Sequence, residues 1–235
     1  MCGRIALYSD PPRLARLVEA GIDPGLVDGV GPHWNVGPTA TILGARESSD
    51  GHRVLRPYRW GLVPRMAKDA SSHKGTFNAR AETVATKQMF RHAFMRGRAL
   101  IPADGFFEWK TVGNIKQPYY FHRADGFPVV FAGLTECWQG EGADPVYSAT
   151  IITTMSGSDM DGIHDRMPVI LEQGAWDHWL DPDVIERDDL EPMLHPAPEG
   201  TLVHYPVSNE VGNIRNDRPE LLHPVPEVTP LNLQW

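Results

Sequence analysis

The residue with the most distinctive potential chemistry is Cys2, which directly follows the initiator methionine. Methionine is removed when the next residue is small, and its removal would leave Cys2 with a free α-amine beside its own thiol. Such an amine has a reference pKa of about 7.7–8.0, so a useful fraction is neutral near pH 7 and can attack an aldehyde to give an imine. The thiol can then close on the imine carbon to form a thiazolidine. A free cysteine is also often only a small apolar side chain, and Cys2 alone favours this second interpretation, which the rest of the chain reverses.

Two further segments carry polar side chains suited to anion binding or proton transfer. Asn78 lies at an expected loop-to-helix junction, where its commonest use is as a helix N-cap. Arg80 follows it in the first helical turn, which the helix dipole disfavours unless the side chain faces an anion such as a phosphate. Glu108 shares a strand face with Phe106, so it is either a carboxyl group with a raised pKa or a surface partner of Lys110.

A third segment presents His164, Asp165 and Arg166 consecutively, just before an apolar stretch. Histidine titrates near neutrality, and a histidine beside an arginine in a loop is a reasonable site candidate, although a lone histidine is more often structural. No pair of His or Cys residues has metal-ligand spacing, and no glycine-rich phosphate loop is present, so we expect neither a metal nor a cofactor.

These side chains need a framework rich in strands, and the alternation of apolar residues predicts one. We expect strands over Ile5–Tyr8, Thr41–Ala45, Arg53–Trp60, Arg98–Pro102, Phe106–Thr111, Pro118–His122, Val129–Leu134, Tyr147–Thr154, Met167–Leu171 and Leu202–Val207. We expect helices over Pro11–Ala20, from Ala81 to Ala93, and over Gln173–Leu180 and Asp183–Leu194, with a loop over Gly21–Pro38. Strands outnumber helices and do not alternate with them, which favours one α+β domain over residues 1–235, mostly antiparallel, with a proline-rich tail from about Pro219.

Composition sets the limits on function. The chain of 235 residues is 41% hydrophobic and 22% charged, which is ordinary for a soluble globular protein. No apolar run approaches the ~20 residues needed to span a bilayer, and the two cysteines make no disulfide framework, so we expect a cytoplasmic protein with no membrane partner. The net charge of −8 argues against non-specific duplex binding but leaves room for a locally basic cleft.

With these pieces in place, the sequence resembles the SOS response-associated peptidase (SRAP) domain family, which shields abasic sites in single-stranded DNA by covalent cross-linking. The matching segments run in order along nearly the whole chain: Met1–Arg4, Trp34–Val36 with Pro38–Thr39, Arg59–Pro64, Asn78–Thr83, Arg98 with Ile101–Trp109, Ala132–Leu134, Thr150–Thr154, His164–Pro168, and Pro206–Ser208 through Val211–Asn213. Several unusual blocks in the same order make the resemblance specific.

The resemblance implies a self-processed amino terminus, thiol peptidase chemistry and a compact α+β fold with coiled, mostly antiparallel sheets and peripheral helices. It implies that Cys2 is the cross-linking residue and that Asn78, Glu108 and His164 line the site around it. It also implies single-stranded DNA with an abasic site as partner, a monomer, nucleoid association when DNA is bound, and DNA contacts from Arg4, Asn35, Trp60, Arg80 and Arg166.

One departure from the family pattern follows Pro64, where members often carry bulky aromatic residues that separate strands or stack on bases. Here Arg65 and Met66 stand instead, and a wedge role is not expected of them. Two rival functions fit Cys2 alone: an N-terminal-nucleophile amidohydrolase, and a cysteine peptidase acting on other proteins through Cys2 and His164. A third, non-catalytic binding of single strands, would not need Cys2.

Overall fold

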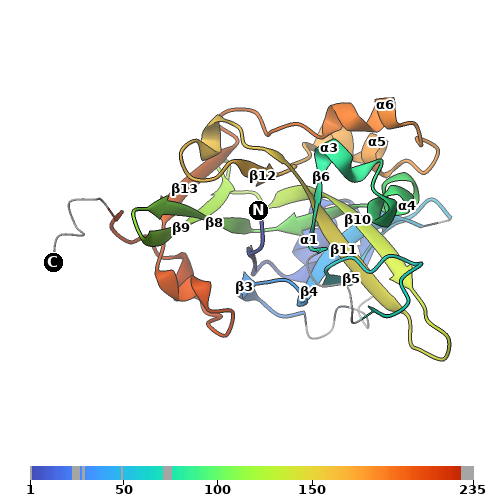
Figure 1. The fold of residues 1–235 in the computed structure, drawn as a ribbon, viewed down its shortest axis with the longest axis horizontal. Helices are drawn as coiled ribbons and strands as arrows, with labels where there is room; N and C mark the ends of the chain where they lie inside the picture. The colour runs from blue at the N-terminus through green and yellow to red at the C-terminus, as the bar shows by residue number, and fades with distance from the viewer. Residues whose placement is uncertain (1, 23–26, 28–29, 49, 71–75, 229–235) are drawn as a thin grey trace.

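Strands that close into a barrel form the centre of the computed structural model, which describes residues 2–22, 27, 30–48, 50–70 and 76–228 (Figure 1). The ring runs β11–β10–β7–β4–β5, and it closes because β11 pairs with β10 on one edge and with β5 on the other. The β11–β5 pairing is parallel, and the other pairings of the ring are antiparallel. The ring strands are β4 (Thr41–Glu47), β5 (Arg53–Trp60), β7 (Arg98–Ala103), β10 (Val129–Trp138) and β11 (Val146–Met155).

Three short strands extend this barrel sheet. Of these, β6 (Asn78–Arg80) runs parallel to β11, β12 (Arg166–Pro168) runs antiparallel to it, and β2 (Gly21–Ile22) lies beside β5. Both β6 and β12 therefore pair with the carboxyl-terminal half of β11. The segments Asn78–Arg80 and His164–Arg166, far apart in the sequence, are brought to the same strand in this way.

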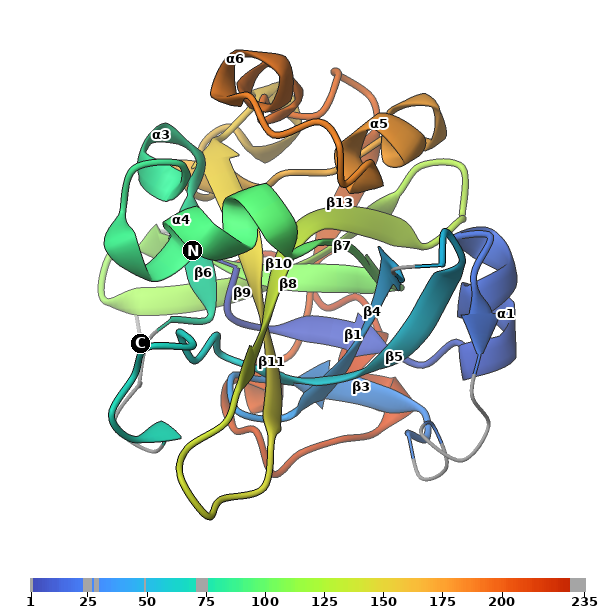
Figure 2. The ribbon, with the colours of Figure 1, turned by 90° about the vertical axis from the view of Figure 1, so that its right-hand side faces the viewer.

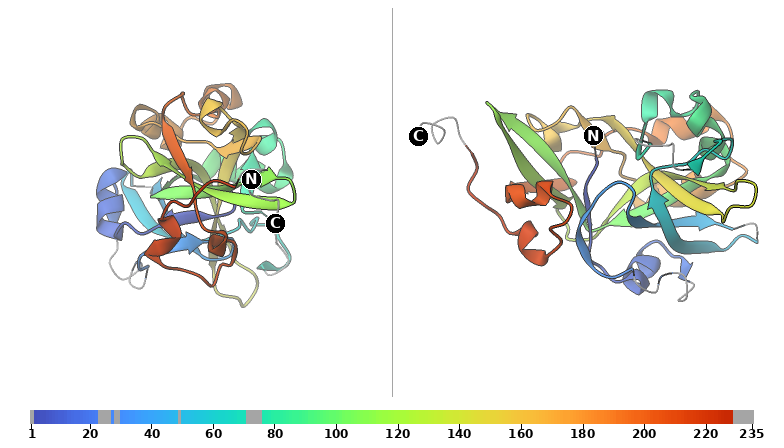
Figure 3. Two further views of the ribbon diagram at one scale, coloured as in Figure 1. Left: turned by 90° about the vertical axis from the view of Figure 1, so that its left-hand side faces the viewer. Right: turned by 60° about the horizontal axis from the view of Figure 1, so that its bottom comes forward.

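A second sheet, in the order β13–β9–β8–β1–β3, carries the amino-terminal strand. Its members are β1 (Ile5–Leu7), β3 (His33–Val36), β8 (Gly105–Val112), β9 (Ile115–Arg123) and β13 (Leu202–Pro206). Strand β1 is paired on both edges, with β8 and with β3, and Figure 3 shows the amino-terminal segment running between the outer part of this sheet and the barrel. A strand with neighbours on both sides has its backbone hydrogen bonds satisfied and its direction fixed.

Alternation along the second sheet divides the apolar side chains between two cores. Ile5 and Phe106 face the main core, where the Phe106 ring stacks on Phe121 with centroids 5.0 Å apart. Ala6 and Phe107 face a smaller cluster that also buries Leu221 of the carboxyl-terminal segment. The expected division of the β8 side chains, with Phe106 and Glu108 on one face, agrees with this arrangement.

The helices are short and lie at the periphery, with α5 and α6 over one end of the barrel and α1 apart from α3 and α4 (Figure 2). They are α1 (Pro11–Leu17), α3 (Ala81–Val84), α4 (Gln88–Arg96), α5 (Trp176–Leu180) and α6 (Arg187–Leu190). Single 3-10 turns cover Ser158–Met160, Gln173–Ala175, Glu191–Met193, Asn209–Gly212 and Pro219–Leu222.

Gly105 opens β8 at a point where the sheet admits no side chain. A Cβ at this position would come within 2.4 Å of the Phe121 carbonyl oxygen on β9, and that atom belongs to the backbone and cannot swing aside. The glycine therefore permits the close approach of β8 to its neighbour. Glu108 lies three residues further along the same strand.

The α+β class with mostly antiparallel sheets and peripheral helices is confirmed, and Arg53–Trp60 forms a strand with the predicted bounds. The predicted loop over Gly21–Pro38 is wrong at β2 and at His33–Val36, which pairs with β1; residues 23–26 and 28–29 of that range lie outside the described residues. The single helix predicted from Ala81 is interrupted after Val84 and restarts as α4, and the interruption contains Thr86, a β-branched residue of low helix propensity.

The predicted helix over Asp183–Leu194 is also too long. Only Arg187–Leu190 is α-helical, and the chain continues as a 3-10 turn over Glu191–Met193 that contains Pro192. Proline removes a backbone donor, so the α-helical ladder cannot continue through it.

Arg98 at the start of β7 ties the helical end of the molecule to the barrel. Its side chain is 5% exposed and donates hydrogen bonds only to backbone carbonyls. The acceptors, at 2.5–3.2 Å, are the carbonyl oxygens of Phe94, Met95, Trp179, Asp181 and Val184. Burial lowers the pKa of Arg98 to about 10, so the guanidinium remains charged at neutral pH.

Replacing Arg98 by methionine should destabilise the fold by about 3 kcal/mol or more, because it leaves several buried carbonyl groups without donors. Urea unfolding measures the loss. The matched control is Arg96→Met in the exposed last turn of α4, which should change stability by less than about 0.5 kcal/mol. Equal losses in the two variants would contradict the role assigned to Arg98.

Candidate functional site

The site is built around Cys2, which enters the structure immediately before β1. Its side chain is fully buried. The strand that follows is held on both edges. On one edge, Phe107 N–H donates to the Arg4 carbonyl and Asp104 N–H donates to the Ala6 carbonyl, both at 2.9 Å. On the other edge, Ile5 is aligned with Val36 of β3. The backbone of Cys2 is therefore fixed by the second sheet rather than carried on a loose tail.

Asn78 reaches Cys2 from the other sheet. It lies on β6, aligned with Ile151 of β11, and its Nδ2 donates to the Cys2 carbonyl at 2.7 Å. Its Oδ1 is buried and has no hydrogen-bond partner among the described residues. The N-cap interpretation of Asn78 is wrong, because the residue before α3 is Arg80 and no side chain caps that helix.

Glu108 places a buried carboxyl group near the cysteine. It lies on β8 opposite Tyr119, and only 2% of it is exposed. Burial raises the pKa of Glu108 above its ordinary value, and the positive charge of a protonated His164 opposes that rise. The pKa of the Cys2 thiol reflects the same proximity. Burial raises this pKa far above its usual range, and the negative charge of Glu108 is the second cause of the rise. The alternative in which Glu108 is a surface partner of Lys110 is excluded by this burial.

His164 completes the cluster. Its Nε2 lies 3.8 Å from Glu108 Oε2. Its Nδ1 lies 3.0 Å from both the Arg166 N–H and a carboxylate oxygen of Asp165, a largely exposed residue. Nδ1 thus has a donor and an acceptor within reach, so the ring keeps its orientation whether that nitrogen carries a proton or not. This is the property that a group alternating between acid and base requires.

The arginines expected to contact DNA differ in whether their side chains are already bound within the protein. Arg80 is exposed at the end of β6, where its side chain can meet a phosphate. Arg166 is buried and forms a bidentate pair with Glu82, with both nitrogen–oxygen distances 3.0 Å, and also donates to the Thr153 carbonyl at 2.7 Å. Hydrogen bonding from Arg166 lowers the pKa of Glu82. Arg166 can therefore bind a phosphate only if its ion pair with Glu82 breaks.

Three other expected DNA contacts are used internally. Trp60 is fully buried and donates from Nε1 to the Phe77 carbonyl at 2.9 Å, so it cannot stack on a base. Asn35 is 3% exposed and its amide nitrogen donates to three backbone carbonyls, so the assignment of both residues to DNA is corrected to a structural role. Arg4 donates to Asn35 Oδ1 at 2.7 Å and to the Val211 carbonyl, which leaves it half-buried.

Glu82 is the site residue that the sequence reasoning did not assign. It stands two residues after Arg80 inside the segment Asn78–Thr83 that carries the family resemblance, which was the only signal for it. Its ion pair with Arg166 could not be predicted from the sequence, because it depends on the pairing of β6 and β12 with opposite edges of β11.

Neither a metal centre nor a membrane segment is found among the described residues. No three of their His, Cys, Asp and Glu side chains are grouped as ligands for a metal ion. Their helices are too short or too polar to cross a bilayer.

Comparison with known proteins identifies close relatives. The family model described as "SOS response associated peptidase (SRAP)" matches residues 1–214. The chain is 38% identical over 224 residues to "Abasic site processing protein YoqW" of Bacillus subtilis, covering 94% of this chain and 99% of that protein. It is 33% identical over 230 residues to "Abasic site processing protein YedK" of Escherichia coli, covering 96% and 100%. It is 32% identical over 264 residues to "Abasic site processing protein HMCES" of Gallus gallus, covering 96% and 78%.

Solved structures agree in fold. A protein from Bacteroides thetaiotaomicron aligns with a TM-score of 0.85 at 24% identity, covering 95% of this chain and all of that one. A protein from Bordetella bronchiseptica aligns with a TM-score of 0.75 at 26% identity, covering 88% and 100%.

Glu108→Gln should flatten the pH dependence of stability. Because the pKa of Glu108 is raised above 4.5 in the folded chain, the folded state binds this proton more tightly than the unfolded state. Protonation therefore stabilises the fold fully below pH 4.5, and that contribution is lost as the pH rises through the raised pKa. As the pH rises above 4.5, urea unfolding should show a smaller fall in stability for the glutamine variant than for the wild type.

The exposed Glu220→Gln serves as the control and should reproduce the wild-type profile. Parallel profiles for the wild type and Glu108→Gln would show that burial does not perturb this carboxyl group.

Proposed function

The chain belongs to the SOS response associated peptidase (SRAP) family, and from this premise we propose that it forms a covalent cross-link between Cys2 and the aldehyde of an abasic site in single-stranded DNA. The relatives are named for abasic-site processing, which supports the same substrate class for this chain. The proposal retains the expectations of a cytoplasmic monomer that needs no cofactor.

The observation that carries the proposal is the convergence of three side chains from different elements on Cys2. Asn78 binds its carbonyl at 2.7 Å, the charge of Glu108 acts on its thiol, and His164 lies 3.8 Å from Glu108. An incidental cysteine in a core needs an apolar environment, not an amide, a carboxyl and an imidazole.

The first requirement is a free Cys2 amine. In self-processing, the Cys2 thiol attacks the Met1 carbonyl while Glu108 or His164 takes the thiol proton. The peptide bond breaks as the thioester forms, and the same group gives the proton to the Cys2 nitrogen, which leaves as the amine. Water then hydrolyses the thioester, which releases methionine and restores the Cys2 thiol. A methionine aminopeptidase would give the same product.

Cross-linking then begins with the amine rather than the sulfur. Burial raises the pKa of the Cys2 thiol, so it carries its proton at neutral pH, whereas the amine has a reference pKa near neutrality. His164 donates a proton to the sugar ring oxygen, which opens the ring to the aldehyde. The amine adds to C1′, Glu108 relays a proton to the departing hydroxyl, and water leaves as the imine forms.

The thiol completes the reaction. Its proton passes to the imine nitrogen, and a sulfur–carbon bond closes the thiazolidine. Asn78 holds the Cys2 backbone throughout, and alignment of this kind can contribute ~7–11 kcal/mol to lowering the barrier. Ring closure also removes the imine that would promote elimination of the 3′ phosphate.

Incubation of the trimmed protein with a single-stranded abasic oligonucleotide should give an adduct that survives denaturant, detected by intact mass. Cys2→Ala should abolish it. The trimmed Cys2→Ser variant, like Cys2→Ala, keeps the amine but lacks the sulfur, so the adduct of either variant should stop at the imine and persist only after reduction with borohydride.

The matched control is Cys137→Ser, at the other cysteine of the chain, which is exposed and should cross-link as the wild type does. Loss of the adduct in Cys137→Ser, or its survival in Cys2→Ala, would refute the assignment of Cys2.

Arg80→Ala should lower the slope of log affinity against log salt by about 0.7, the value for one phosphate contact on a single strand. Arg166→Ala should lower it less, because Glu82 already neutralises that guanidinium. Fluorescence anisotropy with a stable abasic analogue measures both. The control is Arg13→Ala on α1, and equal slopes in all three variants would count against phosphate binding by Arg80.

A further inference from the structure

A groove with an excess of positive charge lies between the segment Pro64–Ala67 and helix α4. It is a hollow of about 390 Å³ whose charged lining comes from Arg65, Arg91, Arg96 and Glu136, with the imidazole of His92 among them. Arg65, Arg91 and Arg96 are exposed, and one carboxylate faces them. This concentration of cations contrasts with the net charge of −8 of the whole chain.

One of the three arginines is held in place by a hydrogen-bonded series. Arg65 Nη1 lies 3.1 Å from His92 Nε2, and His92 Nδ1 lies 2.7 Å from Glu136 Oε1. Since a guanidinium only donates, Nε2 accepts from Arg65 and Nδ1 faces Glu136, so the imidazole ring is held between the two. Glu136 is 7% exposed and belongs to β10, so the series is anchored on the barrel.

The backbone around Arg65 is also fixed. Ala67 N–H donates to the Pro64 carbonyl at 2.9 Å, and Trp138 Nε1 donates to the Ala67 carbonyl at 2.7 Å. An exposed arginine ordinarily loses rotamer freedom when it binds a ligand, and an arginine already held in one orientation loses less. Arg65 is therefore oriented in advance for binding an oxyanion.

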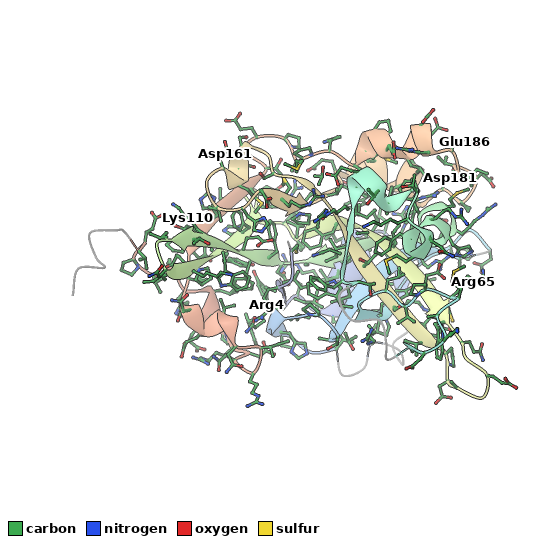
Figure 4. The ribbon with its side chains drawn as sticks, in the orientation of Figure 1. Arg4, Arg65, Lys110, Asp161, Asp181 and Glu186 are labelled. Carbon is green, nitrogen blue, oxygen red and sulfur yellow. The ribbon has the colours of Figure 1, made fainter. Side chains whose placement is uncertain are left out.

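Strand β11 relates the groove to the residue that binds Cys2. Glu136 of the groove lining is aligned with Ser148 of β11, and Asn78 of β6 is aligned with Ile151, three residues further along the same strand. That spacing is roughly 10 Å along β11. From Trp60 at the end of β5 the chain continues to Pro64, which lines the groove. Figure 4 shows Arg65 toward the right-hand end of the molecule, well to one side of Arg4.

We propose that this groove binds the phosphate backbone of the single strand on one side of the reacting nucleotide, with Arg65 as a phosphate contact and His92, supported by Glu136, as its positioning residue. The proposal rests on the proposed function, which brings DNA to Cys2. Guanidinium groups match phosphate geometry, and the exposed thioether of Met66 beside them offers an apolar surface to a base.

The test compares oligonucleotides with one stable abasic analogue and different arms, bound to variants in a Cys2→Ala background that cannot react. Arms of about ten nucleotides on both sides cover a typical single-strand site. Arg65→Ala should weaken binding about three- to tenfold at low salt and lower the salt slope by about 0.7. Removing one arm should abolish this difference, and removing the other should preserve it.

The positioning role of His92 is tested by a double-mutant cycle. His92→Ala should weaken binding of the two-armed probe in the presence of Arg65 and should have no further effect in Arg65→Ala. Arg65→Lys should retain the salt slope because it retains the charge. The exposed Arg13→Ala on α1 is the charge-matched control and should leave both affinity and slope unchanged.

An affinity and slope for Arg65→Ala equal to those of Arg13→Ala would overturn the phosphate contact. Additive effects of His92→Ala and Arg65→Ala would overturn the positioning role. Cross-linking of the Cys2-containing protein to an abasic oligonucleotide with about two nucleotides on each side separates this from the proposed function. If that adduct forms while the arms have no effect, the groove proposal alone fails.

Discussion

The structure depends on the pairing of β1 along both of its edges. On one edge, Phe107 N–H donates to the Arg4 carbonyl and Asp104 N–H donates to the Ala6 carbonyl, and on the other edge Ile5 is aligned with Val36 of β3. Together these pairings hold a chain start that would otherwise fray. They leave Cys2 buried at the junction of the second sheet and the barrel. Because Glu108 comes from the second sheet while Asn78 comes from the barrel sheet, the site exists only where the two sheets meet.

The charges of the site are arranged differently from those of a surface binding patch. Glu108 is buried with its pKa raised, the Cys2 thiol is buried with its pKa raised, and His164 has partners at Nδ1 for either protonation state. Around this interior, Arg166 is held by Glu82 and Arg4 by Asn35 and Val211. Arg166 and Arg4 thus bind groups of the protein itself, whereas exposed arginines such as Arg80 are available to bind a ligand.

The sequence predicted the central strands because their apolar alternation is a local property, and Arg53–Trp60 is the clearest example. It failed at His33–Val36 because that strand is specified by its partner β1 rather than by its own residues. Composition and spacing alone left Asn78 as a helix cap and Glu108 undecided. Only the resemblance grouped them with Cys2 and His164, and it misassigned Asn35 and Trp60 because a motif match does not reveal which side chains are buried.

Because β1 is paired on both edges, it also determines where the preceding residues lie. Side chains alternate across a strand, so the number of residues between Cys2 and Ile5 sets both the depth and the face at which the chain start arrives. One residue more or fewer in that interval would displace the start by one step and turn it toward the opposite face, away from Glu108. The length of the interval Gly3–Arg4 therefore decides whether Cys2 and Glu108 can meet.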